Sequence, residues 1–358
     1  MSATLQTVAD ALGVSRSTVS NAYSRPDQLS PALRERILET ARELGYSGPN
    51  PTARSLRRGR VGAVGVLFTG SLTQAFTDPY AVQFLGGLAQ ATERRDTGLL
   101  LVPLSADDPD GAQRALAEAA VDGFCVYCAP NWQGSLAVIN ARSLPVVTTE
   151  NPTEAGAATL VVSIDERGAS RTAGEHIVGF GHRRIAVLDT WVTTERRNGP
   201  VRLPDPESLP FYISRERICG VRDAVVAAGG SWSDVLVLNA RDNTRADGAA
   251  AAAHALDRAQ RSTAILATTD VLALGVLDAM AARGLRPGHD VSVTGFDDIP
   301  DADRSGLTTI HQPSTEKGRI AGELLLDAPE DPALRRKVLP TSLIVRSSTG
   351  PAPVGSSS

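Results

Sequence analysis

The 358-residue sequence predicts an α/β protein with two parts: an all-α helix-turn-helix headpiece that ends in a hinge helix, and a larger domain of two subdomains built from doubly wound parallel sheets. Three observations lead to this fold class. Short helical patterns separated by capping residues fill the first sixty residues. From Val61 onward, strand-like apolar runs alternate with amphipathic helices. This alternation passes through two similar cycles, so we expect two sheets with a cleft between them.

The first two helical patterns flank a turn at Gly13. Apolar residues of the first helix recur at helical spacing, at Leu5, Val8, Ala9 and Leu12. Ser15 is a suitable N-cap for a second helix that turns Val19 inward. The outer side of this second helix carries Arg16, Ser17 and Asn21, where a recognition helix meets base edges in the major groove. A small helical bundle that binds nothing would show the same pattern.

A third helix completes the headpiece. Ser30 is the expected N-cap, Pro31 the first helical residue and Gly45 the stop. The predicted buried stripe consists of Leu33, Ile37, Leu38, Ala41 and Leu44. Three short helices in this order are sufficient for a helix-turn-helix unit.

The segment 49–60 favours an interaction with DNA. Pro51 can start a short helix that bears Ala53 and Leu56 and ends in arginines. Because so short a helix is marginal in water, its folding needs a partner, and an apolar wedge beside arginines suits the minor groove. Residues 1–60 contain nine Arg, no Lys and five Asp or Glu, a net charge of +4, which leaves −8 for the rest of a chain whose net charge is −4. A phosphate-contacting module on an acidic domain has this asymmetry, although a solvated arginine face alone could produce it.

Composition restricts the class of protein. Hydrophobic residues at 42% and charged residues at 21% are ordinary for a soluble globular chain with sizeable cores. No apolar run reaches the roughly 18 residues of a membrane span, and the N-terminus lacks a signal-peptide pattern, so we expect a cytoplasmic protein without a membrane partner. The three cysteines, Cys125, Cys128 and Cys219, form no disulfide framework. Cys125 and Cys128 have the spacing of a zinc or redox half-site, but they fall in a strand pattern and point to opposite faces, so we expect buried thiols and neither metal nor cofactor.

The larger domain is predicted element by element. The first cycle contains strands at 61–68, 99–104, 123–128 and 145–149, helices at 80–94 and 112–120, and a short helix before the last strand. An apolar run at 160–165 precedes the second cycle. That cycle contains helices at 169–179, 215–228, 245–259 and 271–283, and strands at 184–188, 234–238, 264–268 and 290–296. Apolar strands between amphipathic helices indicate parallel sheets covered on both faces.

Ligands of open parallel sheets bind at the carboxyl ends of the strands. Here these ends carry Glu150, Thr269-Asp270 and Asp297-Asp298. A carboxylate can accept two hydroxyl hydrogens at once, so these residues suit a polar, polyhydroxylated ligand. Asp270 could equally cap the helix that follows it. Asp297 is followed by Asp298, Ile299 and Pro300 instead of a clear helix, which favours the ligand role.

The N-terminal residues resemble a known family. The DNA-binding headpiece and hinge helix of the lactose-repressor (LacI/GalR) family are similar to this chain at Val8-Ala9, Gly13-Val14-Ser15, Thr18-Val19-Ser20, Arg36, Glu43-Leu44-Gly45-Tyr46, Pro49-Asn50, Ala53 and Leu56. The resemblance implies DNA contacts by Thr4, Thr7, Ser15, Arg16, Ser17, Thr18, Ser20, Asn21, Ser30, Asn50, Ala53 and Leu56. Within this set, Arg16, Ser17 and Asn21 would read bases, Ala53 and Leu56 would enter the minor groove, and Leu56 would wedge into a base step. Family members usually have Arg in place of Asn21, and Gly48 and Pro51 alter the linker, so no relative's operator can be copied.

The rest of the chain resembles the effector domain of the same family, which has the fold of periplasmic sugar-binding proteins. The marks lie at 163–166, 181–186, 217–220, 269–275, 293–298 and 307–312. The resemblance implies effector contacts by Arg217, Asp297, Glu150, Thr269 and Gln312, with Phe76, Asp78 and Tyr127 lining the N-terminal half of the cleft. Many relatives have Asn where this chain has Thr269.

The family layout implies a domain division. We expect a headpiece at 1–48, a hinge and linker at 49–60, an effector-binding and dimerisation domain at 61–348 and a disordered tail at 349–358. The N-subdomain would comprise 61–161 and 314–340, and the C-subdomain 162–312 and 341–347. Because the tail lacks a leucine heptad, we expect a homodimer whose two headpieces match a palindromic site. The long insertion at 191–212 could roof the cleft with an aromatic platform, or be mobile and touch nothing.

These expectations combine into a ligand-responsive, sequence-specific DNA-binding regulator, a repressor, with double-stranded operator DNA and a sugar, sugar derivative or nucleoside as partners. An extracytoplasmic solute-binding protein of the same fold is disfavoured by the headpiece and by the missing signal peptide. An α/β enzyme using Asp297 or Asp298 as acid or base is disfavoured because none of the common nucleophile, phosphate-loop, zinc or dinucleotide motifs is present. His182 more readily closes a helix end than donates protons. We therefore expect no enzyme activity.

Overall fold

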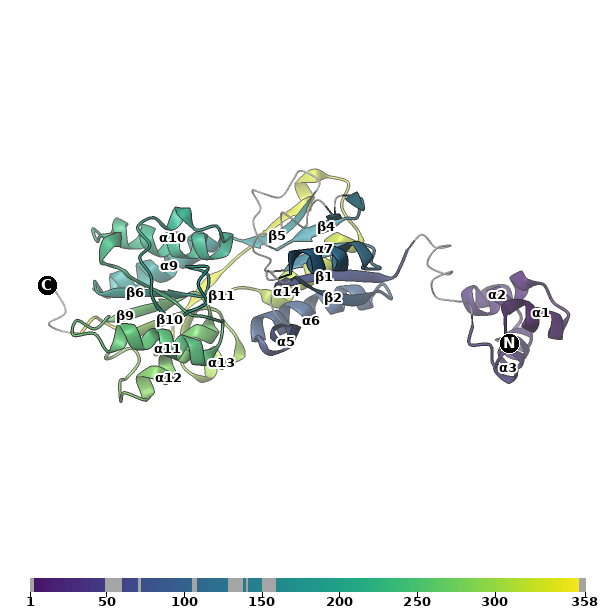
Figure 1. Cartoon of the computed structure of the whole chain (residues 1–358), viewed down its shortest axis with the longest axis horizontal. Helices are drawn as coiled ribbons and strands as arrows, with labels where there is room; N and C mark the ends of the chain where they lie inside the picture. Colours follow the sequence, from purple (N-terminus) through teal and green to yellow (C-terminus); the bar gives the residue numbers. More distant parts are fainter. Residues whose placement is uncertain are drawn as a thin grey trace. The chain divides into compact units, whose positions relative to one another are not determined.

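The computed structural model describes residues 3–48, 60–69, 72–104, 108–127, 138–139, 141–149 and 159–353. The chain separates into two units, Met1–Gly62 and Ala63–Ser358, called unit 1 and unit 2 (Figure 1). The predicted hinge helix, with Asn50, Ala53 and Leu56, lies outside the described residues. The predicted division at 48, 60 and 348 and the subdomain boundaries stay predictions.

Unit 1 is a small helical unit, and the predicted helix-turn-helix is confirmed. Its helices are α1 (Leu5–Leu12), α2 (Arg16–Ser24), the 3₁₀ turn η1 (Pro26–Gln28) and α3 (Pro31–Glu43). Gly13 ends α1 with φ 68°, a left-handed conformation that glycine adopts without strain. The fully buried core consists of Val8, Ala9, Val19, Ala22, Ile37 and Ala41. Leu44 does not belong to it as predicted: α3 ends at Glu43, and Leu44 is 40% exposed at the C-cap.

The first sheet of unit 2 has six parallel strands in the order β12-β5-β4-β3-β1-β2. The strands are β1 (Ala63–Thr69), β2 (Gly98–Leu104), β3 (Phe124–Tyr127), β4 (Val146–Thr148), β5 (Leu160–Ile164) and β12 (Arg336–Leu339). The helices of this half are α5 (Leu72–Thr77), α6 (Pro79–Glu93), α7 (Pro109–Glu118), α14 (Ser314–Leu326) and the 3₁₀ turn η4 (Pro332–Arg335).

The second sheet has the order β13-β11-β10-β9-β6-β8-β7, with parallel inner strands and antiparallel edge strands β13 and β7. The strands are β6 (Ile185–Asp189), β7 (Gly199–Pro200), β8 (Leu236–Asn239), β9 (Ala264–Ala267), β10 (Ser292–Asp297), β11 (Thr308–His311) and β13 (Ser342–Ile344). The helices of this half are α9 (Glu166–Gly179), α10 (Tyr212–Ala227), α11 (Arg245–Leu256), α12 (Asp270–Ala281), α13 (Pro300–Arg304) and the 3₁₀ turns η2 (Pro206–Ser208) and η3 (Trp232–Asp234).

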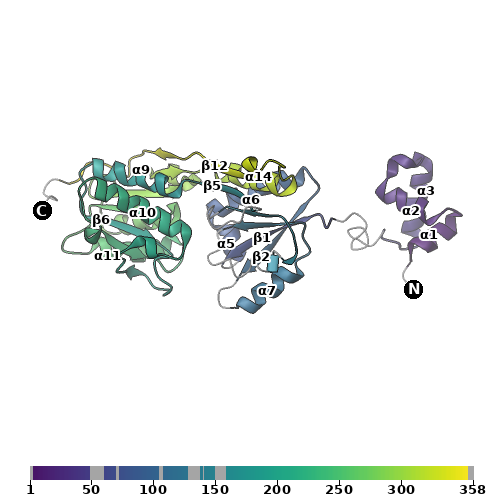
Figure 2. The same cartoon turned by 90° about the horizontal axis from the view of Figure 1, so that it is seen from above.

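The chain passes between the two sheets three times: after β5, after β11 and after β12. Figure 2 shows β5 and β12, which pair in parallel, side by side. The predicted doubly wound architecture is confirmed. The short elements α5, α13, β7, β11, β12 and β13 were not predicted individually, because runs this short carry too little periodicity. The 13-residue helix α14 was not predicted either.

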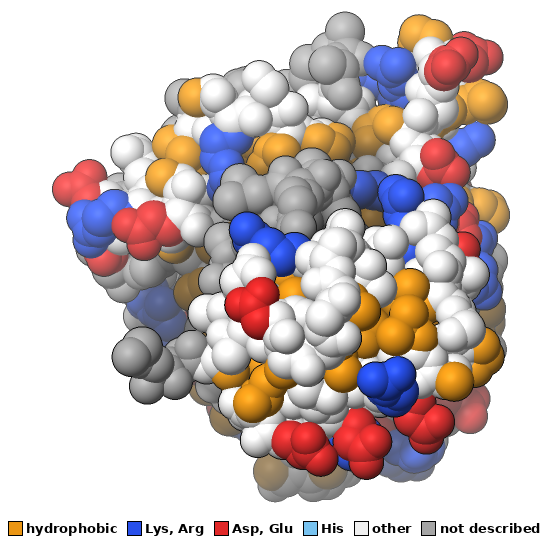
Figure 3. All heavy atoms as spheres, turned by 90° about the vertical axis from the view of Figure 1, so that its right-hand side faces the viewer, with side chains coloured by type: hydrophobic (Ala, Val, Ile, Leu, Met, Phe, Trp, Pro, Cys, Tyr) orange, Lys and Arg blue, Asp and Glu red, His pale blue; other side chains and the backbone are white. Residues whose placement is uncertain are grey.

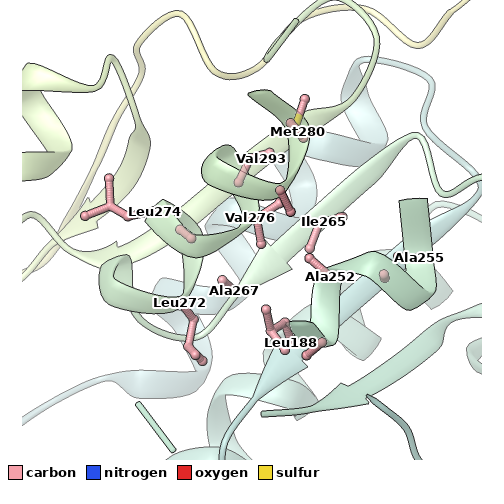
Figure 4. Close-up of a cluster of buried hydrophobic side chains, with 14 of the residues drawn as sticks. Leu188, Ala252, Ala255, Ile265, Ala267, Leu272, Leu274, Val276, Met280 and Val293 are labelled. Atoms are coloured by element: carbon pink, nitrogen blue, oxygen red, sulfur yellow. The ribbon is translucent and has the colours of Figure 1, made fainter. Parts of the chain in front are cut away.

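Apolar side chains cover both faces of each sheet. In the cluster of Figure 4, Ile265 and Val293 lie near Val276 and Met280 of α12, and Leu188 lies near Ala252 of α11. Small residues of α11 complete this cluster, which explains how an alanine-rich helix can approach the sheet closely. Burial of such aliphatic side chains is the main source of stability for a domain of this type.

Glycines stand where paired helices cross. A Cβ at Gly87 of α6 would overlap the carbonyl oxygen of Thr315, and one at Gly318 of α14 would overlap that of Phe84. The same close approach recurs between α9 and α10 at Gly220. Each crossing therefore depends on a missing side chain.

The tail is ordered further than predicted. The buried His182 ring lies 2.9 Å from the Ser292 hydroxyl and 3.0 Å from the Gly350 carbonyl oxygen. The Ala352 amide donates to the Phe180 carbonyl at 2.9 Å. The prediction of disorder is wrong for 349–353, because backbone groups of a Gly- and Pro-rich segment can bond to buried partners, while 354–358 lie outside the described residues.

Gly87→Ala should destabilise unit 2 by about 1–3 kcal/mol, because α6 and α14 would have to separate. Gly86 is the matched control: a Cβ there meets no atom within 4 Å, so Gly86→Ala should stabilise the helix by about 0.4–1 kcal/mol. Chemical denaturation followed by circular dichroism measures both changes. Equal midpoints for the two variants would contradict the close helix crossing.

Candidate functional site

The second helix of unit 1 presents Arg16 to solvent. Arg16 is the first residue of α2, is exposed, and makes no hydrogen bond or ion pair with any described residue. The Ser15 hydroxyl accepts the Thr18 amide at 3.1 Å and lies 2.7 Å from the Ser17 hydroxyl, so these residues fix the start of the helix. A helix N-terminus beside a free guanidinium suits a phosphate or a base edge.

The other predicted DNA contacts are helix caps and half-buried side chains. Thr4 and Thr7 form a capping box at the start of α1, and Ser30 caps α3. Asn21 donates from Nδ2 to Gln28 Oε1 at 3.2 Å. Gln28 was missed, because nothing in the spacing of α2 indicates a partner in the following turn. The half-buried members of the predicted set are Thr18, Ser20 and Asn21.

The positive charge of the N-terminal region is not carried by the folded helices. Residues 3–48 contain five Arg and five Asp or Glu, so they are neutral in sum. The +4 of residues 1–60 comes from Arg54, Arg57, Arg58 and Arg60. On the face of the chain seen in Figure 3, basic, acidic and apolar side chains are interspersed. Any DNA contacts of α2 would therefore come from single side chains and not from a net charge of the described helices.

In unit 2, Arg217 of α10 is the centre of a buried polar cluster at the carboxyl ends of the strands. Its Nε donates to Glu166 Oε2 at 2.7 Å and its Nη1 to the Thr268 carbonyl oxygen at 2.5 Å, while Nη1 lies 3.9 Å from Asp297 Oδ1. The guanidinium carbon lies 3.6 Å from the centre of the Phe296 ring. Burial opposes the charge, but Glu166 and Asp297 outweigh it and raise the pKa of Arg217, so the side chain remains a cation.

Asp297 ends β10 in a strained conformation. Its φ is 124° and that of Asp298 is 58°, values that residues other than glycine rarely adopt. The buried Asp270 carboxylate holds this turn, because it accepts the Ile299 amide at 2.9 Å and the Thr309 hydroxyl at 2.5 Å. Burial raises the pKa of Asp297 well above its ordinary value and that of Asp270 to about 6.

Two expectations about these aspartates are corrected. The short helix α13 begins three residues after Asp297, so the prediction that no helix follows is wrong; its N-cap is Ile299, and Asp297 does not cap it. Thr269 caps α12 by accepting the Leu272 amide at 3.2 Å. Asp270 is therefore neither the cap nor an exposed ligand group, but a buried support for the turn.

Within the described residues, two buried side-chain atoms near the connections between the sheets have no hydrogen-bond partner. Gln312 is 2% exposed and donates from Nε2 to Asp297 Oδ1 at 2.6 Å, but its Oε1 accepts no hydrogen bond within the described residues. The Oγ of Ser163 on β5 is likewise unpartnered in that part of the chain. An unpaired buried polar atom costs about 1–3 kcal/mol, so such atoms indicate places where a ligand or water supplies the partner.

Asp78 and Thr269, predicted on opposite subdomains, are connected through Asn243. Asn243 Nδ2 donates to Asp78 Oδ2 at 3.1 Å, and Thr269 Oγ1 donates to Asn243 Oδ1 at 2.7 Å. Asp78 also accepts the Tyr80 amide at 2.9 Å and so caps α6. Asn243 was missed, although it follows β8 and the strand-end rule applied to that strand would have found it. A ligand at Asp78 or Thr269 would compete with this contact between the two halves.

The remaining predicted residues of the first half differ in accessibility. Phe76 of α5 is 67% exposed. Tyr127 is 5% exposed, and its ring centre lies 4.5 Å from that of Phe68 and 4.8 Å from that of Phe84. Tyr127 therefore packs mainly in the core and can offer a ligand only a small edge. Glu150 lies outside the described residues.

The insertion at 191–212 is described throughout and packs against the second sheet. Its buried side chains are Val192, Pro206, Leu209 and Phe211. Gly199–Pro200 forms β7 beside β8, and Asn198 Nδ2 donates to Asp247 Oδ1 at 2.9 Å. The alternative of a mobile insertion without contacts is therefore wrong.

Two of the three cysteines lie within the described residues. Cys125 and Cys219 are buried free thiols, and burial raises the pKa of each to about 12. Cys128 lies outside the described residues. Within the described ranges, His, Cys, Asp and Glu side chains form no group of three or more that could hold a metal ion. No helix in that part of the chain combines the length and the apolar character needed to cross a membrane.

Both units match known proteins. Residues 4–50 match the family described as bacterial regulatory proteins, lacI family, and residues 175–349 match the periplasmic binding protein-like domain. The chain is 44% identical to a helix-turn-helix-type transcriptional regulator of Mycolicibacterium smegmatis, over 98% of this chain and 97% of the relative. The crystal structure of a LacI-family transcriptional regulator from Corynebacterium glutamicum is 35% identical with a TM-score of 0.74, over 96% of this chain and 98% of that one. A complex of the transcriptional regulator CelR with cellobiose is 27% identical with a TM-score of 0.68, over 97% and 99% of the two chains. With its helix-turn-helix unit and its two-sheet domain, the chain belongs to the LacI family of DNA-binding transcriptional regulators.

Proposed function

We propose that the chain is a ligand-responsive repressor that binds a palindromic operator as a homodimer and a small polar metabolite at Arg217, Asp297 and Gln312. The observation that carries the ligand site is the buried Oε1 of Gln312, which has no hydrogen-bond partner among the described residues and lies beside a carboxyl group held in a strained turn. A ligand hydroxyl would donate to Oε1, and a second hydroxyl to Asp297. Among sugars, sugar derivatives and nucleosides, the complex of CelR with cellobiose supports a sugar.

The DNA half of the proposal rests on the exposed N-terminal turn of α2. Two copies related by a two-fold axis would place two such helices in successive major grooves, which corresponds to a palindromic site. A dimer bound beside a promoter excludes polymerase sterically and needs no further contact surface, which favours repression. Such a regulator acts in the cytoplasm, and we propose that location for this chain.

The two activities would be coupled through the connections between the sheets. The Asp78–Asn243 hydrogen bond joins the halves in the arrangement described here. A ligand that prefers one arrangement of the halves would alter the spacing of the two hinge helices in the dimer. A differential affinity of about 1–3 kcal/mol is the usual size of such coupling.

Arg16→Ala should lower affinity for an operator selected from a random duplex library by about 1–3 kcal/mol and affect random DNA much less, because a base contact is lost. Arg25→Ala is the matched control. It removes the same charge about 13 Å farther along α2, beyond the turn that faces bases. Fluorescence anisotropy at fixed salt measures all four affinities. Equal losses on both DNAs for Arg16→Ala would reject Arg16 as a base reader.

Asp297→Asn should weaken a ligand found by thermal-shift screening of sugars and nucleosides at least tenfold, while operator affinity without ligand stays unchanged. Asn keeps the shape and tolerates the backbone conformation, but it offers a hydroxyl one neutral acceptor in place of a carboxylate. Asp301→Asn, on the exposed helix α13, is the control and should bind normally. Calorimetry with full-length protein measures the affinities. Unaltered binding by Asp297→Asn would place the ligand elsewhere.

A further inference from the structure

Trp191 is exposed but held in place. Trp191 is 47% exposed, and its backbone amide donates to Asp189 Oδ1 at 2.6 Å. Asp189 is 3% exposed and also accepts the hydroxyls of Ser214 at 2.7 Å and Thr268 at 2.6 Å. The buried Asp189 carboxylate accepts three hydrogen bonds and thus fixes the backbone at the start of the insertion, from which the indole side chain extends.

A second aromatic ring supports the indole from behind. The ring centres of Trp191 and Phe211 are 5.3 Å apart with an interplanar angle of 39°. Phe211 is 7% exposed and belongs to the core, whereas almost half of Trp191 remains exposed. The next amide, that of Val192, donates to the buried Asn239 side chain at 3.1 Å. The indole is therefore partly exposed to solvent, while hydrogen bonds hold the backbone of Trp191 and Val192 in place.

The residues that hold Trp191 in place are hydrogen-bonded to the cluster around Arg217. Thr268 donates its hydroxyl to Asp189, and its carbonyl oxygen accepts the Arg217 guanidinium at 2.5 Å. Asp189 and Asp297 end β6 and β10, which flank β9, so two strand spacings of about 4.8 Å separate them along the carboxyl edge of the sheet. Trp191, two residues after the end of β6, and Asp297 at the end of β10 therefore lie at the same edge of the sheet.

We infer that Trp191, supported by Phe211, is the stacking wall of the effector site, and that the effector is a hydroxylated saturated ring with one apolar C–H face, as in a pyranose. This inference rests on the proposed ligand site at Asp297. Aromatic faces pack well against apolar ring faces, and the polar groups of such a ring can still reach the carboxylate and amide of the cluster. An acyclic polyol would satisfy the polar groups but could not cover the indole.

The groups around Trp191 favour a sugar-type ring over a nucleobase. A base needs hydrogen-bonding groups along its edge as well as a stacking surface. The amides nearest to the platform are already used: Asn239 bonds to Val192, Arg197 and Ala240, and Asn198 bonds to Asp247 and Arg241. A saturated ring requires no such edge at the platform.

Trp191→Ala and Trp191→Phe in the full-length protein test the inference by calorimetry. The probes are cellobiose, methyl α-D-glucopyranoside and methyl β-D-galactopyranoside, with D-sorbitol as the acyclic comparison and adenosine as the nucleoside. At least one pyranoside should bind. Trp191→Ala should weaken it about tenfold or more and Trp191→Phe less than about threefold, and sorbitol should bind the unaltered protein at least about tenfold more weakly than that pyranoside. Trp232→Phe is the control: Trp232 is 9% exposed and donates to the Leu203 carbonyl, so it should leave the ligand affinity unchanged.

Each contrary result has its own meaning. If a pyranoside binds in a manner that requires Asp297 but Trp191→Ala binds it equally well, the stacking wall is wrong and the proposed site stands. If sorbitol or adenosine binds and no pyranoside does, the assigned ligand class is wrong. If no probe binds, both the ring ligand and the sugar effector are rejected, while the DNA test with Arg16 is unaffected. If Trp191→Ala changes only the sedimentation of the dimer, Trp191 belongs to an interface between copies and the inference fails.

Discussion

The second half of the effector domain depends on one buried cation. Arg217 extends from α10 to a carboxylate on α9 and to the backbone after β9, and each of these partners is 51 residues away in the sequence. A buried guanidinium is stable only when paired and hydrogen-bonded, so these elements must meet at the correct edge of the sheet. Asp297 lies 3.9 Å from the same guanidinium, beyond hydrogen-bonding distance. Its carboxyl group therefore lies near a positive charge without a hydrogen bond to it, so that an oxygen remains available to a ligand hydroxyl.

Strain at the end of β10 is maintained by a second buried carboxylate. Asp270 occupies the space where Gly295 lacks a side chain, and from there it accepts the Ile299 amide and the Thr309 hydroxyl. Its pKa of about 6 indicates that the ionised form is less favourable in the fold than in water. The turn that aims Asp297 is thus held at a cost in stability, as is common for binding sites. Neither Asp270 nor Gly295 would contact a ligand, but the position of Asp297 requires both.

Features that depend on neighbouring residues could be predicted from the sequence, and features that depend on contacts between distant residues could not. Most inner strands and long helices were predictable because their apolar periodicity is local: the strand expected at 264–268 is observed at Ala264–Ala267. The inner strand β11 and the helix α14 were missed. Arg217, Asp297 and Gln312 were singled out by family resemblance, and the structure brings them together, although contact with a ligand stays a prediction. Asn243 and Asp189 were not singled out, because their roles depend on which strand ends become neighbours. The ordered tail was missed for the same reason, since its partner His182 is 168 residues away from Gly350.

In the N-terminal region, the net positive charge lies in a different segment from the helix for which base contacts are proposed. The described helices of unit 1 are neutral in sum, so long-range attraction to phosphates resides mainly in the arginines at 54–60. That segment leads directly into β1, whose sheet also contains β5 and β12, two of the strands from which the chain crosses to the effector half. A rearrangement of the two halves would therefore act first on the segment that holds the charge, before it reaches α2, for which we propose the base contacts. Because each phosphate contact contributes to counterion release whatever the base sequence, an effector acting on this segment would change affinity for all sites and leave the choice among them to Arg16 and its neighbours.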